Sequence, residues 1–289
     1  MHKYLRAIGF SRIKYKSQAE KIIGEGLMHP DRWESYKYQP NATFYQYEKT
    51  LFDDVGISLQ GEWNENDRPE VDNLYPLLYG RGITTTELVE VEALTDREGF
   101  AGICDDPRVE ISLIFGIQNT LEVKRAVEEK RSGEVATTLS GLSLGGKILF
   151  PVTKSANQIE NSKRMSANRN NLVARARKGD ERAIESLTIS DMDTYSDIAK
   201  RIVTEDVMTL VDSFFMPYGI ESDKYSILGE ILECHELINP YSREHVIKMR
   251  VNCSDLEFDI CMNKEDLLGE PAVGRRFKGT IWLQGRVVI

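Results

Sequence analysis

A serine within a glycine-rich stretch is the residue whose type and spacing come closest to a catalytic motif. Residues 141–145, with the sequence GLSLG, fit the nucleophile elbow, in which a sharp turn between a strand and a helix exposes the serine hydroxyl. The residues that follow, 147–151, read KILFP and predict a strand that ends at a proline rather than a helix. The required context is therefore missing, and we interpret the glycines as a hairpin turn.

The same stretch also fits the first part of a phosphate-binding loop. Gly141 is followed after four residues by Gly146 and Lys147, but Ile148 stands where a serine or threonine would bind magnesium. A helix whose amino end could face the phosphate is not predicted either. We therefore expect no nucleotide at this stretch, and the sequence indicates no other cofactor.

Cysteines and histidines toward the end of the chain raise the possibility of a metal site. The side chains concerned are Cys234, His235, His245, Cys253 and Cys261. They form no Cys-x-x-Cys knuckle, and strand neighbours such as Cys234 and His235 point to opposite faces. We expect no bound metal, and we expect all the thiols, Cys104 included, to be reduced.

Basic and aromatic residues of the last predicted strand are the candidate binding residues. Strand alternation places Phe277, Gly279, Ile281 and Leu283 on one face and Arg276, Lys278, Thr280, Trp282 and Gln284 on the other. A tryptophan flanked by cations on an open face could stack on a base, a sugar or a peptide aromatic ring, so Arg276, Lys278 and Trp282 are predicted to bind a ligand or partner. The alternative, which the usual burial of large aromatics favours, is that Trp282 packs against the helical region or a partner subunit.

The elements that must position these residues begin with an α+β region over residues 1–152. An apolar stripe after Ser17 predicts a helix, and alternation predicts strands over 43–51 and 109–117 and a pair of strands over 135–152. Asn119 can cap a helix between these strands. We expect a mainly antiparallel sheet with a few helices.

Residues 153–222 are predicted to form a linker and a helical segment. Apolar periodicity is lost over 153–171, which is typical of a connection between domains. Asp180, Ser190 and Thr204 are then placed to cap three successive helices, with Gly179 ending the helix before the first of them.

The last segment, residues 223–289, is predicted to form a small β-barrel domain. If Ser254 and Asp255 form a two-residue turn, Val251 faces Phe258, and the next apolar residues of the two strands also face each other. A slip of one residue would turn every apolar side chain outward. The order strand-strand-strand-helix-strand is similar to an OB-like fold.

Composition and charge limit the classes of protein to which the chain can belong. The chain has 289 residues, a formal net charge of −9 and a hydrophobic fraction of 41%. Such an acidic chain is not expected to attach as a whole to nucleic acid or to an anionic membrane. The sequence contains no predicted signal peptide and no apolar run of about 18 residues, so we expect a cytoplasmic protein with no membrane span.

Several phrases spread along the chain resemble an uncharacterised bacterial family, domain of unknown function 3881. These phrases are 1–11 (MHKYLRAIGFS), 183–188 (AIESLT), 193–196 (DTYS), 211–219 (VDSFFMPYG) and 269–286, which starts with GEP and ends with GR. The resemblance implies a cytoplasmic bacterial protein. It implies no activity and no catalytic or binding residue.

Three functional hypotheses follow from these observations. Because the catalytic patterns fail, the leading hypothesis is a non-enzymatic interaction or ligand-binding protein, whose partner could be another protein or a second copy of the chain. The first alternative is an enzyme, a hydrolase or transferase, whose site is assembled from scattered residues. The second is a nucleic-acid-associated protein that acts through its C-terminal barrel.

Overall fold

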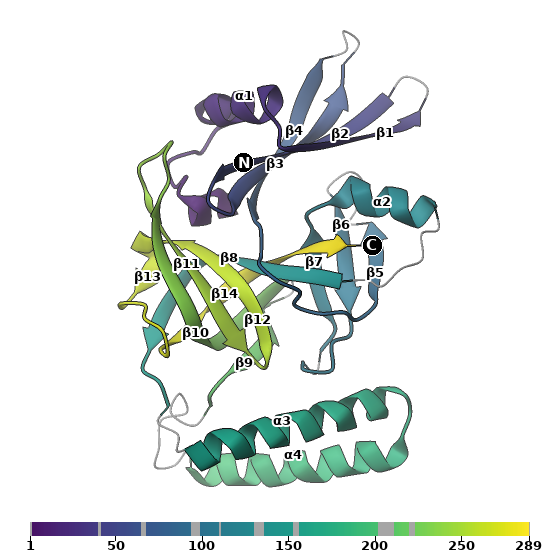
Figure 1. The fold of residues 1–289 in the computed structure, drawn as a ribbon, viewed down its shortest axis with the longest axis vertical. Coiled ribbons are helices and arrows are strands. Elements are labelled where there is room, and N and C mark those ends of the chain that lie inside the picture. Colours follow the sequence, from purple (N-terminus) through teal and green to yellow (C-terminus); the bar gives the residue numbers. More distant parts are fainter. Residues whose placement is uncertain are drawn as a thin grey trace.

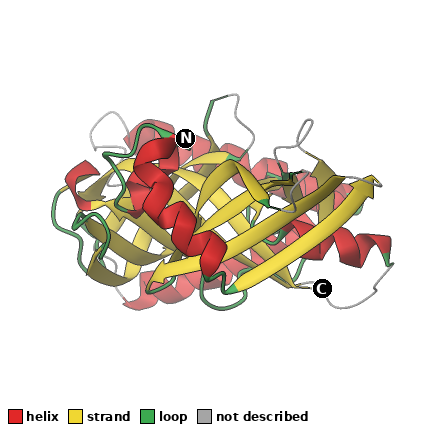
Figure 2. Ribbon diagram, turned by 90° about the horizontal axis from the view of Figure 1, so that it is seen from above, coloured by secondary structure: helices red, strands yellow, loops and turns green. Residues whose placement is uncertain are grey.

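A closed barrel, a separate antiparallel sheet and a pair of long helices make up the protein (Figure 1). The computed structural model describes residues 2–39, 42–64, 68–93, 99–109, 111–129, 136–152, 156–201, 211–219 and 223–288. Seen from above, the helices lie on the outside of the strands (Figure 2). The protein is therefore α+β, as the sequence predicted.

The separate sheet is an antiparallel meander of four strands. Its strands are β1 (Arg32–Gln39), β2 (Ala42–Phe52), β3 (Val55–Trp63) and β4 (Pro69–Leu78). Two short 3-10 helices, η1 (Lys3–Ile8) and η2 (Lys16–Ala19), and the helix α1 (Glu20–Met28) precede it. Helix α1 packs closely on β3, because a Cβ atom on Gly26 would lie only 2.7 Å from Leu59 Cδ1.

A second antiparallel group extends one wall of the barrel. It consists of β5 (Val89–Ala93), β6 (Phe100–Cys104) and β7 (Leu113–Ile117), followed by the helix α2 (Thr120–Glu128). Leu113, Phe115 and Ile117 are buried on one face, as the alternation predicted. The strand begins later than predicted, because Arg108 Nε donates to Asp106 Oδ1 at 2.8 Å and holds a turn there.

The barrel closes through five strands. These are β8 (Ala136–Leu149), β10 (Lys224–Ile238), β11 (His245–Cys253), β12 (Leu256–Asn263) and β14 (Arg276–Val288). Strand β8 pairs in parallel with β12 and antiparallel with β14, and this double pairing closes the barrel. The short elements β9 (Phe214–Pro217), η3 (Lys264–Asp266) and β13 (Leu267–Leu268) lie beside it, with β9 on β10 and β13 on β8.

Strand β8 differs from its prediction. It is one continuous strand, whereas the sequence predicted two strands around a glycine turn. The glycines instead make room for large side chains of β14, since a Cβ on Gly146 would lie 2.3 Å from the ring of Phe277, and one on Gly141 would lie 3.0 Å from Ile281. The barrel thus takes its closing strand from outside 223–289, although the division into three domains stays a prediction.

The hairpin of β11 and β12 has the predicted register. Val251 lies opposite Phe258, Met249 opposite Ile260 and Ile247 opposite Met262, so this prediction is confirmed. The turn residues Ser254 and Asp255 have φ values of 53° and 63°. Both positive values are what a two-residue turn of this kind requires.

The central helical segment is a hairpin of two long helices, α3 (Ala156–Arg177) and α4 (Glu181–Arg201), which lies apart from the barrel (Figure 1). As predicted, Gly179 ends the first helix, with a φ of 85°, and Asp180 Oδ1 accepts from the backbone of Arg182 and Ala183. The connection predicted over 153–171 is helical from residue 156.

Two further predictions for this segment need correction. The separate helices expected at Asp180 and Ser190 are one continuous helix, because no glycine or proline interrupts 181–201. The helix expected from Thr204 falls on residues 202–210, which lie outside the described ranges. Phe214, expected at its end, instead begins the strand β9.

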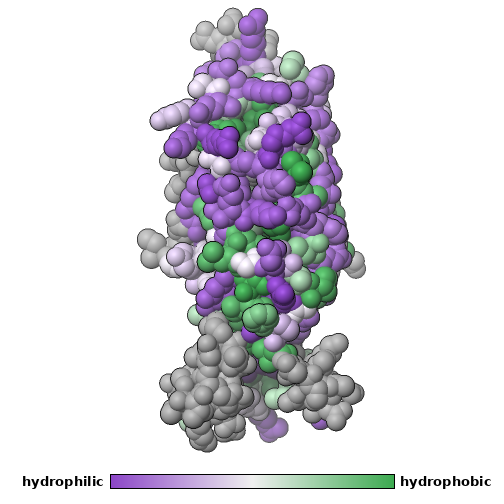
Figure 3. Space-filling view, turned by 90° about the vertical axis from the view of Figure 1, so that its left-hand side faces the viewer, coloured by the Kyte–Doolittle hydropathy of each residue, from purple (hydrophilic) through white to green (hydrophobic). Residues whose placement is uncertain are grey.

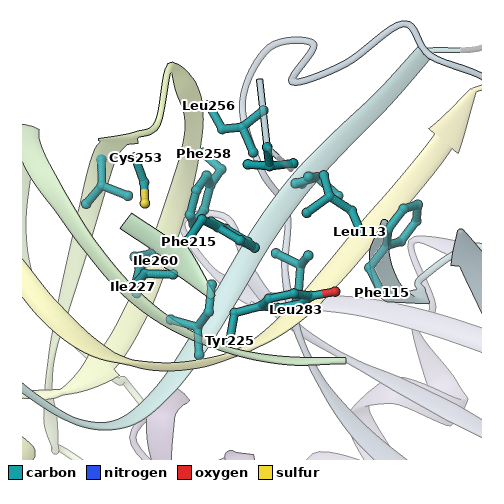
Figure 4. Packing of buried hydrophobic residues seen from close by; sticks show 14 of the residues in the cluster. Leu113, Phe115, Phe215, Tyr225, Ile227, Cys253, Leu256, Phe258, Ile260 and Leu283 are labelled. Atoms are coloured by element: carbon teal, nitrogen blue, oxygen red, sulfur yellow. The ribbon is translucent and has the colours of Figure 1, made fainter. Parts of the chain in front are cut away.

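The main core fills the barrel and continues under β7. Phe215 of β9 contacts Tyr225 and Phe258, with ring centroids 4.6 and 6.0 Å apart. Figure 4 shows these rings together with Leu113 and Phe115 from β7. A second core cluster lies between the outside of the barrel, η1, α1 and the separate sheet. The barrel is therefore covered on this side.

Replacing Asp255 by glycine should raise the free energy of unfolding by about 1 kcal/mol, because glycine adopts a positive φ without steric cost. Urea unfolding followed by circular dichroism measures this change. The matched control is Asp255→Ala, which also removes the carboxylate but keeps the Cβ atom, and it should not stabilise. Equal midpoints for wild type and Asp255→Gly would contradict the prediction.

Candidate functional site

A pocket of about 500 Å³ lies where the separate sheet, the strand β7, the barrel strand β14 and the first residues of the chain meet. Pockets that bind small molecules typically have volumes of about 300–1,000 Å³. The residues on which its chemistry depends are His2, Gln60, Gln118, Asp223, Trp282 and Gln284. They come from five separate segments of the sequence, and only the fold brings these segments together.

Two buried glutamines form one wall of this pocket. Gln118 Nε2 donates to Leu78 O at 2.8 Å and to Gln284 Oε1 at 3.1 Å, and it also lies 3.3 Å from Ser140 Oγ. Gln284 Nε2 donates in turn to Pro76 O at 2.8 Å. Because buried amides are costly when unpaired, this network fixes β4, β7, β8 and β14 relative to one another.

Aromatic rings form another wall. The indole of Trp282 stacks on Tyr4 with centroids 5.3 Å apart, and the ring of His2 lies 4.4 Å from that of Trp282. Tyr75 meets His2 edge-on at 5.3 Å. Trp282 Nε1 donates to Asp223 Oδ2 at 2.6 Å, so both the face and the donor of the indole are held in place.

Two polar atoms of the pocket lining are left without a partner. His2 Nδ1 and Gln60 Oε1 are buried and make no hydrogen bond to any described residue. Gln60 is only 4% exposed. An unsatisfied buried polar group costs about 1–3 kcal/mol, so a pocket that contains two of them is suited to a molecule that pairs with them.

Burial favours the neutral forms of the titratable side chains around the pocket. Desolvation, helped by the charge of Lys3, lowers the pKa of His2 to about 4, so its imidazole is neutral at pH 7. Desolvation also raises the pKa of Asp223 above its usual value, and it raises the pKa of Tyr4 to about 12. A neutral imidazole offers one nitrogen as donor and the other as acceptor.

The structure places the three predicted binding residues on the outer face of the barrel, but not at one site. Phe277, Ile281 and Leu283 point into the core, as the alternation predicted. Trp282 lines the pocket and is 9% exposed. Arg276 lies six residues away, about 20 Å along a strand, and its guanidinium donates to Phe150 O and Val211 O. One small ligand cannot reach both, and the binding role of these residues stays a prediction.

Lys278 also lies away from the pocket. Its ammonium group is 5.8 Å from the centroid of the Phe214 ring. Sequence reasoning missed His2, Gln60, Gln118 and Asp223, because each is an isolated polar residue with no motif around it. Of the pocket residues other than Trp282, the sequence pointed only to Gln284, because strand alternation places Gln284 on the same face as Trp282.

The cysteines do not act at this site. Cys104, Cys253 and Cys261 are buried, Cys234 is half-buried, and all four are free. Burial raises the pKa of Cys253 and of Cys261 to about 12, so neither thiol forms a reactive thiolate near neutral pH. Within the described ranges, no three histidine, cysteine, aspartate or glutamate residues are grouped as a metal site would require.

The fold and the pocket together define a mixed α+β protein with a closed barrel and a small-molecule-sized pocket between that barrel and a separate sheet. The chain belongs to the family described as "Domain of unknown function, E. rectale Gene description (DUF3881)", whose model matches residues 5–285. The resemblance found in the sequence is therefore confirmed. No curated protein and no solved structure matches the chain. In the part of the chain that is described, no helix has the length and apolar character needed to cross a membrane.

Replacing Trp282 by alanine should lower the free energy of unfolding by about 3–5 kcal/mol, because the ring is buried in the second core cluster. Urea unfolding measures the loss. Trp33, which is 60% exposed, supplies the control, and Trp33→Ala should cost no more than about 1 kcal/mol. A loss below about 1 kcal/mol for Trp282→Ala would show that the ring is not part of the core.

His2 should make stability depend on pH. Its pKa is about 4 in the folded protein and about 6.5 in an unfolded chain, so between these values the unfolded chain binds the additional proton. The stabilisation is therefore complete above pH 6.5 and is lost as the pH falls toward 4. The unfolding free energy of wild type minus that of His2→Phe, taken with its sign, should therefore fall as the pH is lowered over this range. A difference that is constant or grows in acid would contradict the assignment.

Proposed function

We propose that this protein is a cytoplasmic bacterial ligand-binding protein that takes a small organic molecule in the pocket between the sheet and the barrel. The observation that carries the proposal is the carbonyl oxygen of Gln60, which is buried in the pocket lining without a partner among the described residues. A ligand that donates a hydrogen bond to this oxygen would offset the cost of burying it.

The lining favours a neutral molecule with both polar and apolar parts. Ile23, Leu74 and Phe100 contribute apolar surface, while His2 and Gln60 contribute hydrogen-bonding atoms. The charged side chains that line the pocket, Lys16, Asp72 and Asp223, are of both signs, and Lys16 donates to Val71 O. A neutral ligand with one donor group opposite Gln60 therefore fits this lining better than an ion does.

Binding without conversion is supported by the hydroxyl groups of the pocket. Thr120 Oγ1 donates to Ile117 O at 3.0 Å, and Ser58 Oγ lies 3.5 Å from Gln46 Nε2. Covalent catalysis by a hydroxyl needs a base within hydrogen-bonding reach of it. His2 Nδ1 has no hydrogen-bond partner among the described residues, these hydroxyls included, so the arrangement favours binding over catalysis.

In Figure 3, the upper part of the face that is drawn is mainly hydrophilic, which does not favour a broad docking surface there. Hydrophilic side chains cover most of this face, and the apolar ones that show between them gather mainly in its lower half. A face that docks another protein commonly has a continuous apolar centre.

A second candidate function, protein interaction, is favoured by the helical hairpin. Four large apolar side chains of α3 and α4 are strongly exposed: Met165, Ile184, Ile189 and Met192. Exposed apolar side chains on a projecting hairpin are suited to contact with another protein or a second copy of the chain. If this function is correct, changing these four residues to glutamine would abolish association without changing the pocket.

The proposed function predicts a molecule that co-purifies with the protein. The protein should be isolated from the cells that make it naturally, denatured, and its small molecules identified by mass spectrometry. Gln60→Met keeps the size of the side chain but removes the carbonyl oxygen, and it should retain the molecule about tenfold less, the equivalent of one hydrogen bond. Glu230→Met, on an exposed position of β10, is the control.

Two outcomes would contradict the proposal. One is that no molecule is enriched in the wild-type protein over a control protein purified in parallel. The other is that Gln60→Met, shown by circular dichroism to be folded, retains the molecule as well as wild type does.

A further inference from the structure

The amide of Gln60 limits which neutral molecules fit the first pocket, the one between the sheet and the barrel. This side chain is 4% exposed and lines the pocket, and its carbonyl oxygen has no hydrogen-bonding partner among the described residues. A primary amide carries an NH2 donor beside that acceptor, in the same plane. A ligand that pairs with both atoms therefore presents a donor and an acceptor side by side.

Three other polar side chains of the lining already have hydrogen-bonding partners. Gln118 Nε2 and Gln284 Nε2 donate to the backbone of β4, and Thr120 Oγ1 donates to Ile117 O. A sugar would bring several hydroxyl groups into the pocket, each of which needs a partner when it is buried. A ligand with one polar edge and two apolar faces fits this lining better.

A glycine and an aromatic ring favour a flat ligand. Gly116 of β7 lines the pocket, and a Cβ atom there would lie 3.6 Å from Trp282, an ordinary van der Waals contact. Packing therefore does not require glycine at this position, and the missing side chain leaves space to the pocket. Phe100 is half-buried and lines the same pocket. Enzymes that take up a nucleobase bind its edge by hydrogen bonds and its faces by aromatic and apolar side chains.

We propose that the first pocket binds adenine, as the free base or as its nucleoside adenosine. This proposal rests on the ligand-binding function proposed above and names the class of ligand. The 6-amino group of adenine donates to Gln60 Oε1, and Gln60 Nε2 donates to the neighbouring ring nitrogen. Glutamine recognises adenine in nucleic acids by this pairing.

Isothermal titration calorimetry of the dialysed full-length protein with adenosine, adenine and purine riboside tests the proposal. Purine riboside is adenosine without the 6-amino group, so wild type should bind it about tenfold more weakly, the equivalent of one hydrogen bond. Gln60→Met lacks the partner of that group and should bind the two nucleosides equally. Weaker binding of adenine than of adenosine would identify the nucleoside as the ligand, and binding at least as tight would identify the free base.

A second variant tests the place of binding without changing Gln60. Gly116→Val fills part of the pocket from β7 and should weaken the binding of adenosine at least tenfold. The matched control is Gly145→Val, which adds the same side chain to β8. No atom of the described residues lies within 4 Å of a Cβ at Gly145, which lines a different pocket of about 570 Å³. This control should bind adenosine as wild type does.

Three results would overturn the proposal. They are a wild-type protein that binds neither adenine nor adenosine, a Gln60→Met variant that still prefers adenosine to purine riboside, and an equal loss of binding in Gly116→Val and Gly145→Val. The molecule that co-purifies distinguishes this failure from that of the proposed function. If it is a sugar or another compound without such an edge, only the adenine proposal fails. If no molecule co-purifies and adenosine does not bind, both proposals fail.

Discussion

The pairing of two buried glutamine side chains is the constraint on which the arrangement of the molecule depends. Gln118 and Gln284 are 5% and 2% exposed, and their amides reach the backbone of β4, the hydroxyl of Ser140 on β8, and each other. Gln46 of β2 also donates to the carbonyl of Gln118. Buried amide groups need hydrogen-bonding partners, and these hydrogen bonds are directional. The separate sheet, β7 and the barrel are therefore held in one relative position, which is the position that forms the first pocket.

The outer face of the barrel strand β14 borders two pockets: the first, described above, and a second of about 570 Å³. Trp282 lines the first pocket, while Tyr4, stacked on it, lines the second. The carboxylate of Asp223 faces the first pocket, and the ammonium of the next residue, Lys224, lines the second. Neighbouring residues of the chain, Asp223 and Lys224, thus line different pockets.

Local features of the fold could be predicted from the sequence, and features that depend on distant partners could not. The register of β11 and β12 followed from alternation and a two-residue turn, all within a short stretch. The continuity of β8 did not, because its glycines look like turn residues until Phe277 and Ile281 are known to pack on them. At the site, alternation gave the correct face for Trp282, but nothing near it in sequence showed that η1 and Tyr4 cover that face. The unpaired Gln60 could be recognised only once its surroundings were known.

The position of β8 in the chain has a consequence for how the protein folds. Both partners of this strand in the barrel, β12 and β14, follow it by more than a hundred residues. Contacts between such distant segments form slowly, because the entropy of closing a long loop is lost before any pairing compensates for it. During synthesis β8 therefore lacks both of its barrel partners while the helical hairpin and the β10–β12 meander are still being made. Unpaired strand edges favour pairing between chains. The yield of folded protein therefore depends on how quickly the late strand β14 reaches the early strand β8.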